Sequence, residues 1–404
     1  MADEESFEEE ETGGEEQDEE DEAEPPGDEE QDPEHVEGEE EEEKVPPNPL
    51  TEDIIAESLS LLCKTGDGLS HAYVRLDIHE RGVTDISILK SFIHLRYVDV
   101  SKNALKDISP LSALTHMLTL KADENLLTSP HLEEMPFLQV ASFSHNRINT
   151  TEGINHPMLE HLILSNNIIT QVTGLDAMKL TRLHTLELRG NKLESTDGIY
   201  LPNIKNLFLG ANVIKRVEGL GRCTGLTTLH LRDNQLENLD GFTEDLKELQ
   251  YINLRGNLVT SVKEAAKLKG LPFLRALVLS ENPVAEEDDY RLEVLIALRS
   301  LERLDKDEFT DEERTEAEEI FETRKAEAEA AEAEAKAVEE QEERDREARE
   351  EEERERLERE GEEELVREAS DSDGLEEKVS ETEEGPDDAE DAANEPEDED
   401  EDET

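Results

Sequence analysis

Apolar residues recur along the middle of the chain with a period of just over twenty residues. The clearest copies follow the order L-x-x-L-x-L-x-x-N-x-L, as in Leu183, Leu186, Leu188, Asn191 and Leu193. The asparagines of successive copies are Asn103, Asn125, Asn146, Asn167, Asn191, Asn212, Asn234, Asn257 and Asn282. This self-similarity predicts a leucine-rich-repeat solenoid over residues 73–284, with repeats of about 22 residues.

Each copy predicts a short strand in a parallel sheet. Alternate side chains of a strand point to opposite faces, so the leucines enter the core and the residues between them line the concave surface. The asparagine is expected to satisfy backbone groups where the chain turns inward, because a buried unpaired polar group costs about 1–3 kcal/mol. In the first copy Arg81 stands where asparagine is expected.

Both ends of a solenoid need a cover. In an N-terminal helical cap at residues 47–72, Thr51 is expected to cap a helix whose apolar side includes Ile54, Ile55, Leu59, Leu61 and Leu62. In a C-terminal cap at residues 285–310, a second helix is predicted from the spacing of Val294, Leu295, Leu298, Leu301 and Leu304. The predicted fold class is therefore an α/β leucine-rich-repeat solenoid with helical caps.

Charge is distributed very unevenly along the chain. The net charge is -69. Residues 1–50 hold 26 acidic residues and one lysine, residues 306–404 hold 49 acidic and 13 basic residues, and -8 is left for residues 51–305. We expect residues 1–46 and 369–404 to be disordered acidic tails, because such compositions cannot bury a core.

Residues 311–368 differ from the tails because Glu, Ala and Arg dominate there. Glu–Arg pairs three and four residues apart contribute about 0.2–0.5 kcal/mol each, which favours a helix without a core. Such a helix would be about 87 Å long. A solvated single helix, a partner-dependent coiled coil and disorder all stay open, although a coiled coil would have a poor apolar seam.

The predicted concave face carries candidate protein-binding residues. Two positions before the repeat asparagine, Arg189, Arg232 and Arg255 form one column that Gly210 interrupts. Aromatic and arginine side chains dominate the energetics of interfaces. The candidates, taken from this and the two neighbouring columns, are Ile163, Arg189, Phe208, Arg232, Tyr251, Arg255 and Val278. The alternative is an ordinary solvated face whose arginines pair with Glu187 and Asp233.

No residue set in the sequence points to catalysis. There is no phosphate-binding glycine loop, no nucleophile elbow and no cysteine with a neighbouring base. His161, His184 and Glu187 fall near one another on adjacent strands, but on an open sheet such residues are far more often plain surface residues than metal ligands. We expect a non-enzymatic protein without cofactor, metal or small-molecule substrate.

The remaining features restrict compartment and partners. Cys63 and Cys223 have neither metal-ligand nor disulfide-framework spacing, which indicates a reduced intracellular compartment. The N-terminus lacks the pattern of a signal peptide, and no run of about 18 apolar residues exists, so we expect no membrane association. Acidic tails would repel phosphate backbones, so no nucleic acid is expected as a partner.

Several segments carry a family resemblance. The repeats with the stretch from Asn282-Pro283-Val284 to Asp305 resemble the class typified by protein-phosphatase-1 regulatory repeat proteins and axonemal dynein light chain 1. The chain resembles the family of leucine-rich-repeat-containing protein 23 more closely. The segments that carry this resemblance are Leu61–Gly66, His94–Asp99, Thr228–Gln235 and Arg275–Leu279. This likeness covers about residues 47–310 and includes positions outside the repeat pattern.

The resemblance implies a structural protein of the ciliary cytoskeleton in the cytoplasm. Members of that family are implied to be radial-spoke components of the axoneme in motile cilia and sperm flagella, where they contact spoke-head and spoke-neck proteins. The long acidic tails match the family less well. Two other functions combine such repeats with an acidic tail or a regulatory surface: an acidic nuclear histone chaperone and a phosphatase-1 regulatory subunit.

Overall fold

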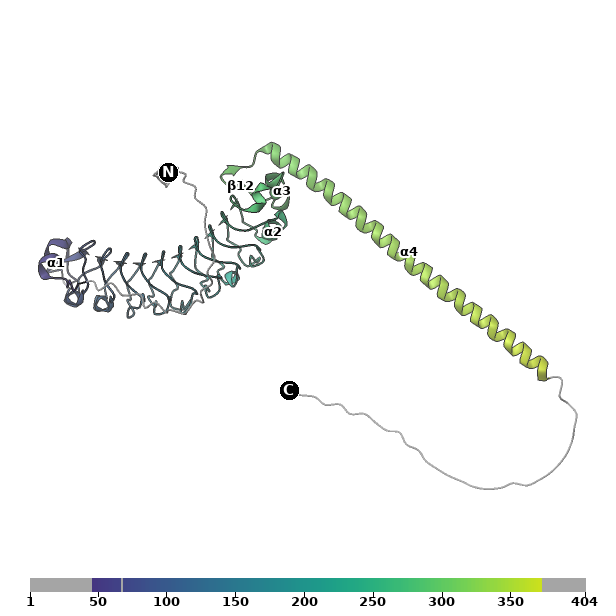
Figure 1. The fold of residues 1–404 in the computed structure, drawn as a ribbon, viewed down its shortest axis with the longest axis horizontal. Helices are drawn as coiled ribbons and strands as arrows, with labels where there is room; N and C mark the ends of the chain where they lie inside the picture. Colours follow the sequence, from purple (N-terminus) through teal and green to yellow (C-terminus); the bar gives the residue numbers. More distant parts are fainter. Residues whose placement is uncertain (1–45, 67, 373–404) are drawn as a thin grey trace, which may run out of the picture.

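The computed structural model describes residues 46–66 and 68–372. They form a curved solenoid of short strands and turns, and one long helix extends from its C-terminal end (Figure 1). The predicted leucine-rich-repeat fold is confirmed by this architecture. Nearly all of the two segments that were predicted to be disordered acidic tails lies outside the described residues.

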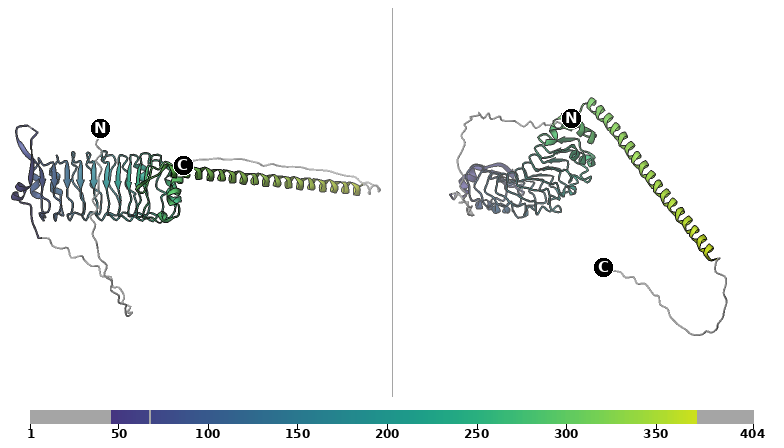
Figure 2. Two further views of the ribbon diagram at one scale, coloured as in Figure 1. Left: turned by 90° about the horizontal axis from the view of Figure 1, so that it is seen from above. Right: turned by 45° about the vertical axis from the view of Figure 1, so that its right-hand side comes forward.

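Thirteen strands form one open sheet in the order in which they occur along the chain. Neighbouring strands from β2 (His71–Asp77) to β12 (Arg303–Leu304) pair in parallel. They make a ladder along the concave side of the arc (Figure 2). The strands between them are β3 (Tyr97–Asp99), β4 (Thr119–Lys121), β5 (Val140–Ser142), β6 (His161–Ile163), β7 (Thr185–Glu187), β8 (Asn206–Phe208), β9 (Thr228–His230), β10 (Tyr251–Asn253) and β11 (Ala276–Val278).

Turns and short helices connect the strands. The connecting helices are α2 (Val262–Ala266) and the 3₁₀ helices η1 (Ser87–Ser91), η2 (Ser109–Ala113), η3 (Leu220–Arg222), η4 (Lys267–Gly270) and η5 (Pro283–Glu286). The repeat leucines lie fully inside, and one continuous apolar core runs through the solenoid. Each repeat therefore buries its apolar side chains against its neighbours rather than within itself.

The repeat asparagines are hydrogen-bonded to backbone, and all of them are buried except Asn103, which is half-buried. In Asn212, Nδ2 donates to the carbonyls of Leu188 at 3.0 Å and Leu209 at 2.9 Å, and Oδ1 accepts from the Leu193 N–H at 3.1 Å. These bonds join one turn to the preceding repeat. In the first repeat, where Arg81 replaces asparagine, its backbone N–H donates to Oδ1 of Asn103 at 3.2 Å.

The N-terminal cap is a short helix followed by a hairpin. Thr51 caps α1 (Glu52–Ser58) as predicted, since its side chain accepts from the Ile54 N–H. The helix was expected to continue through Leu59, Leu61 and Leu62, and this is wrong, because β1 (Leu59–Lys64) pairs antiparallel with β2. The pairing satisfies the outer edge of β2, which a helix would leave exposed.

The C-terminal cap also contains an unpredicted hairpin. The helix α3 (Tyr290–Ala297) ends before Leu301 and Leu304, which were expected to extend it. Instead, Leu304 in β12 pairs with Leu277, and β12 pairs antiparallel with β13 (Asp307–Glu308). Asp305 follows β12 and closes this end of the ladder, since its Oδ1 accepts from the Leu279 N–H at 2.9 Å and the Ser280 N–H at 2.8 Å.

The long helix α4 spans Asp311–Ser372 and has 62 residues, a length of about 93 Å at 1.5 Å per residue. Every side chain from Glu322 to Glu363 is exposed. The segment is thus helical, and its solvation as a single helix, rather than as part of a coiled coil, stays a prediction. Within the described ranges, no helix has the length and apolar character needed to span a membrane.

Candidate protein-binding surface

Parallel pairing aligns the outward-facing residues of neighbouring strands into rows. One row contains Ile163, Glu187, Phe208, His230, Asn253 and Val278, each paired with the next. Ile163 and Phe208 are therefore separated by the half-buried Glu187, and Val278 is separated from His230 by Asn253. The candidate residues Ile163 and Val278 lie at the two ends of the row and do not touch its aromatic centre.

The centre of the surface is a stack of three rings. Phe208 and His230 stack with their ring centroids 4.8 Å apart and their planes at 24°. The His230 ring lies 5.2 Å from that of Tyr251 on the next strand. All three side chains are half-buried, and burial raises the pKa of the Tyr251 hydroxyl. The sequence pattern placed Tyr251 in a separate column, but the structure brings it into contact with this stack.

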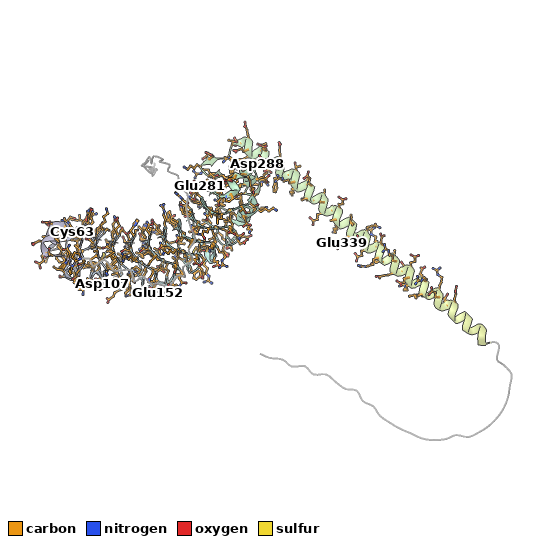
Figure 3. All side chains as sticks on the ribbon, in the orientation of Figure 1. Cys63, Asp107, Glu152, Glu281, Asp288 and Glu339 are labelled. Carbon is orange, nitrogen blue, oxygen red and sulfur yellow. The ribbon has the colours of Figure 1, made fainter. Side chains whose placement is uncertain are left out.

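The arginines form a second row beside the stack. Backbone hydrogen bonds join the neighbouring repeats along this row. The Ala211 N–H donates to the Arg232 carbonyl and the Asp233 N–H donates to the Arg255 carbonyl, both at 2.8 Å. Arg232 Nε pairs with Asp233 Oδ2 at 2.9 Å. Arg255 pairs with Glu281, whose position is shown in Figure 3, and Arg255 together with Arg232 lowers the pKa of that carboxyl.

The alternative prediction, in which the arginines are neutralised by Glu187 and Asp233, is half realised. Asp233 does pair with Arg232. In the part of the chain that the structure describes, Glu187 forms no ion pair with an arginine, and burial raises the pKa of its carboxyl. The exposed Arg189 has no carboxylate within ion-pair distance among the described residues. The face therefore keeps part of its positive charge.

Sequence reasoning missed two arginines that border the stack. Arg275 and Arg303 line a pocket of about 420 Å³ together with Tyr251, Thr227, Thr228 and Gln250. Arg303 escaped notice because Leu301 and Leu304 were assigned to a helix, which hid one more strand. The repeat spacing of these two leucines was the signal that could have revealed it.

His161 and His184 do lie together, as their positions on adjacent strands predict. Their rings meet edge to face with centroids 4.8 Å apart. Burial lowers the pKa of His184 and raises that of Glu187, because burial disfavours the charged form of each group. No set of three His, Cys, Asp or Glu side chains suited to a metal ion occurs within residues 46–66 and 68–372.

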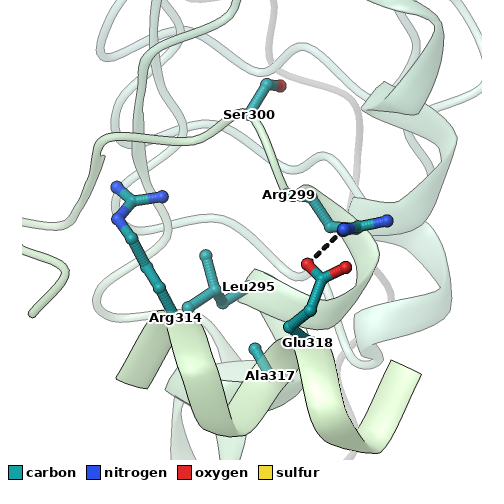
Figure 4. Close-up of a pocket in the computed structure, with 6 residues that line it drawn as sticks. All are labelled: Leu295, Arg299, Ser300, Arg314, Ala317 and Glu318. Atoms are coloured by element: carbon teal, nitrogen blue, oxygen red, sulfur yellow. Dashed lines mark hydrogen bonds and ion pairs between the residues drawn. The ribbon is translucent and has the colours of Figure 1, made fainter. Parts of the chain in front are cut away.

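A separate pocket of about 390 Å³ lies where α4 meets the C-terminal cap. It is lined by Leu295, Arg299, Ser300, Arg314, Ala317 and Glu318 (Figure 4). Arg299 and Glu318 point toward one another and form an ion pair, and Arg314 donates to the Leu301 carbonyl at 3.0 Å. Its charged groups are engaged in holding α4, so we assign this pocket to the junction rather than to ligand binding.

Known proteins share both the repeats and the rest of the solenoid. The model of the leucine-rich-repeat family matches residues 180–334. Leucine-rich repeat-containing protein 23 of Bos taurus is 56% identical over 272 residues, which cover 67% of this chain and 80% of the relative. The Homo sapiens protein of that name is 55% identical over 283 residues, covering 70% of this chain and 82% of the relative.

Among solved structures, a leucine-rich-repeat protein of Leptospira interrogans aligns with a TM-score of 0.49 at 22% identity, over 57% of this chain and 60% of that chain. The relatives from Bos taurus and Homo sapiens are matched over most of their own length and at more than half of the aligned positions. The chain belongs to the family of leucine-rich repeat-containing protein 23.

Proposed function

We propose that this chain is a non-enzymatic scaffold that binds other proteins on the concave face of its solenoid. The observation that carries the proposal is the stack of Phe208, His230 and Tyr251 beside a row of arginines. Aromatic rings contribute large apolar area at little entropic cost, and arginine adds charge-assisted hydrogen bonds. A surface that combines both suits a macromolecular partner.

The scaffold is further proposed to be a radial-spoke component of the axoneme in motile cilia and flagella. There it would contact spoke-head and spoke-neck proteins and support spoke assembly and motility. This part rests on what membership in the family of leucine-rich repeat-containing protein 23 implies. The shape of the molecule supports it, because a binding arc and a rod of about 93 Å can reach two partners far apart.

Fractionation of cilia tests the proposed location. Demembranated and salt-washed axonemes should retain the chain, and axonemes from mutants that lack a radial spoke should lose it. Release of all the chain into the soluble matrix fraction, or a nuclear location, would contradict the proposal and favour an acidic chaperone. Phosphatase activity that co-purifies with the chain would favour a phosphatase-1 regulatory subunit.

The variant Arg232→Glu tests the surface itself. Reversal of this exposed charge beside the aromatic stack should weaken capture of spoke proteins by at least about fivefold, since it places a carboxylate where the partner meets a cation. The unfolding midpoint should not change, because Arg232 is exposed. Lys192→Glu, an exposed residue beyond the repeat turn, is the matched control. Equal capture by both variants would remove Arg232 from the interface.

A further inference from the structure

Cations without a neutralising neighbour lie on both sides of the aromatic stack. Arg189 lies in the arginine row on one side, and Lys205 and Arg303 lie toward the strand starts on the other. All three side chains are exposed, and the described residues place no carboxylate within ion-pair distance of them. By contrast, the cations Arg232, Arg255 and Arg275 pair with Asp233, Glu281 and Glu302.

The pocket beside Tyr251 adds a place for an anionic group. Arg303 is close enough to Tyr251 to oppose the rise in the pKa of its hydroxyl, and Arg275 directly precedes β11, the strand that lies between β10 and β12. Thr227, Thr228 and Gln250 supply further hydrogen-bonding side chains to a volume of about 420 Å³. Glu302 also lines the pocket and pairs with Arg275 at 3.8 Å, so an incoming carboxylate would meet Arg303 next to the aromatic ring.

The other half of the concave face is mixed in charge. Asp77 and Asp99 lie opposite one another in the strand register, at the outward positions of β2 and β3. Asp123 follows β4, where its Oδ1 accepts from the Ser144 N–H and from Ser142 Oγ at 2.6 Å. Because Arg75 and Lys121 are exposed on β2 and β4, this half carries charges of both signs. A partner with negative charge is therefore favoured on β7–β12, where Arg189, Lys205 and Arg303 form no ion pair with any described residue.

We propose that the concave face of β7–β12 binds an acidic segment of a partner protein, with an aromatic or large apolar residue between its carboxylates. This inference rests on the proposed scaffold function and names the chemistry of the partner. The apolar residue lies against Phe208, His230 and Tyr251. Carboxylates on one side meet Arg189, and carboxylates on the other side meet Lys205 and Arg303.

Photo-cross-linking in whole ciliated cells tests the proposal with the full chain. The photoreactive amino acid p-benzoylphenylalanine replaces Thr228, which is half-buried between Asn206 and Tyr251 on neighbouring strands. The cross-linked peptide is then identified by mass spectrometry. The same amino acid at Leu258, 45% exposed and beyond the repeat turn, reports non-specific contact.

The expected result is one predominant peptide from another protein, net acidic and containing an aromatic or large apolar residue, at Thr228 and not at Leu258. The double variant Arg189→Glu, Arg303→Glu should reduce its yield about tenfold, since both flanking charges are reversed. The control Lys192→Glu, Lys215→Glu has the same change in net charge at exposed positions outside the concave face and should change the yield less than about twofold.

Three outcomes would overturn the inference. They are a neutral or basic cross-linked peptide, equal loss of yield in both double variants, and a cross-link to residues 1–45 or 373–404 of this chain, which would make the occupant internal. Because whole cells are irradiated before fractionation, the result does not depend on where in the cell the chain resides. A neutral peptide on a chain retained in axonemes contradicts only the acidic partner, whereas an acidic peptide on a chain absent from axonemes contradicts only the proposed location.

Discussion

At the scale of single residues, Asn234 shows how the solenoid is held between repeats. Its Oδ1 accepts from the Ile214 N–H at 3.1 Å, and Nδ2 donates to the carbonyls of Leu209, Leu231 and Arg232. The variant Asn234→Ala leaves a buried N–H and buried carbonyls without partners. We expect it to lower the free energy of unfolding by about 2–4 kcal/mol, measured by urea denaturation.

A second asparagine provides the control for this measurement. Asn206 is half-buried, and its side chain makes one long hydrogen bond, of 3.4 Å to Thr185 Oγ1. Asn206→Ala should lower the free energy of unfolding by less than about 1 kcal/mol. Equal losses for Asn206→Ala and Asn234→Ala would show that the repeat asparagine has no special structural role.

His156 occupies a core position that leucine or methionine fills in neighbouring repeats. It is 2% exposed, its Nδ1 accepts from the Met135 N–H at 3.2 Å, and burial together with nearby His131 lowers its pKa to about 4. The folded-state pKa lies below the ordinary 6.5, so the unfolded chain binds more protons between these values. The stability due to neutral His156 is therefore present above about pH 6.5 and is lost as the pH falls toward 4.

The variant His156→Gln tests this titration, because glutamine keeps an acceptor but does not titrate in this range. Between pH 7 and pH 5 the wild type should lose about 2 kcal/mol more unfolding free energy than the variant, as the pKa shift implies. Chemical denaturation at both pH values gives the difference. Parallel losses would mean that His156 is protonated as easily in the folded state as in the unfolded chain.

At the scale of elements, the repeats were predictable and the two ends were not. The repeat leucines determine strand positions because only one register buries all of them. Leu301 and Leu304 satisfy both a helical spacing and the Leu-x-x-Leu spacing of the repeat, and sequence alone does not decide between them. The open edge of β11 decides, because its backbone groups need partners and β12 supplies them.

For the binding surface, the sequence predicted only which residues share a column on the concave face. Repeat spacing places Phe208, Tyr251 and the arginines on one face, but contact between rings depends on side-chain orientation across strands, which the pattern does not contain. Ion pairs such as Arg255 with Glu281 join residues 26 positions apart, at different places in their repeats. The sequence alone therefore could not distinguish the arginines that form ion pairs from those that form none.

The attachment of α4 was also not foreseen. Thr310 and Glu313 form a capping box, in which the Thr310 N–H donates to the Glu313 carboxylate at 2.7 Å and the Glu313 N–H donates to Thr310 Oγ1 at 3.2 Å. Arg291 and this capping bond hold the pKa of Glu313 at about 2. Arg324 binds both carboxylate oxygens of Glu293 on α3, at 2.7 and 2.9 Å.

We predict that these contacts fix the direction of α4 relative to the solenoid. A single exposed ion pair contributes only about 0–1 kcal/mol. The half-buried Phe321, which lies beneath Arg299, adds an apolar contact to the ion pairs at this junction. Arg299→Glu opposes Glu318 with a like charge and removes this cation–π contact. It should broaden the distribution of α4 positions.

Electron-spin distance measurements between labels at Leu258→Cys and Val338→Cys, in a Cys63→Ser background, report that distribution. The wild-type arrangement should give a narrow distance distribution, Arg299→Glu a wider one, and the charge swap Arg299→Glu, Glu318→Arg a partly restored one. Identical distribution widths in all three proteins would show that the direction of α4 relative to the solenoid does not depend on this ion pair.

At the scale of the whole molecule, charge and shape are divided along the chain. The net charge of -69 lies mainly outside the solenoid, whose residues 51–305 carry -8. Strongly charged ends of one sign oppose self-association of the chain. The concave face of β7–β12 is where we propose that an acidic partner binds. The rod begins at the C-terminal cap, next to that half of the face (Figure 1).

We propose above that this chain is a structural part of a radial spoke. Subtomogram averaging of axonemes with and without the chain tests it most directly. We expect density to be lost at a radial spoke, in the form of a curved body, and to return when the full chain is restored. Axonemes whose spokes are unchanged without the chain, or whose lost density lies away from every spoke, would contradict it.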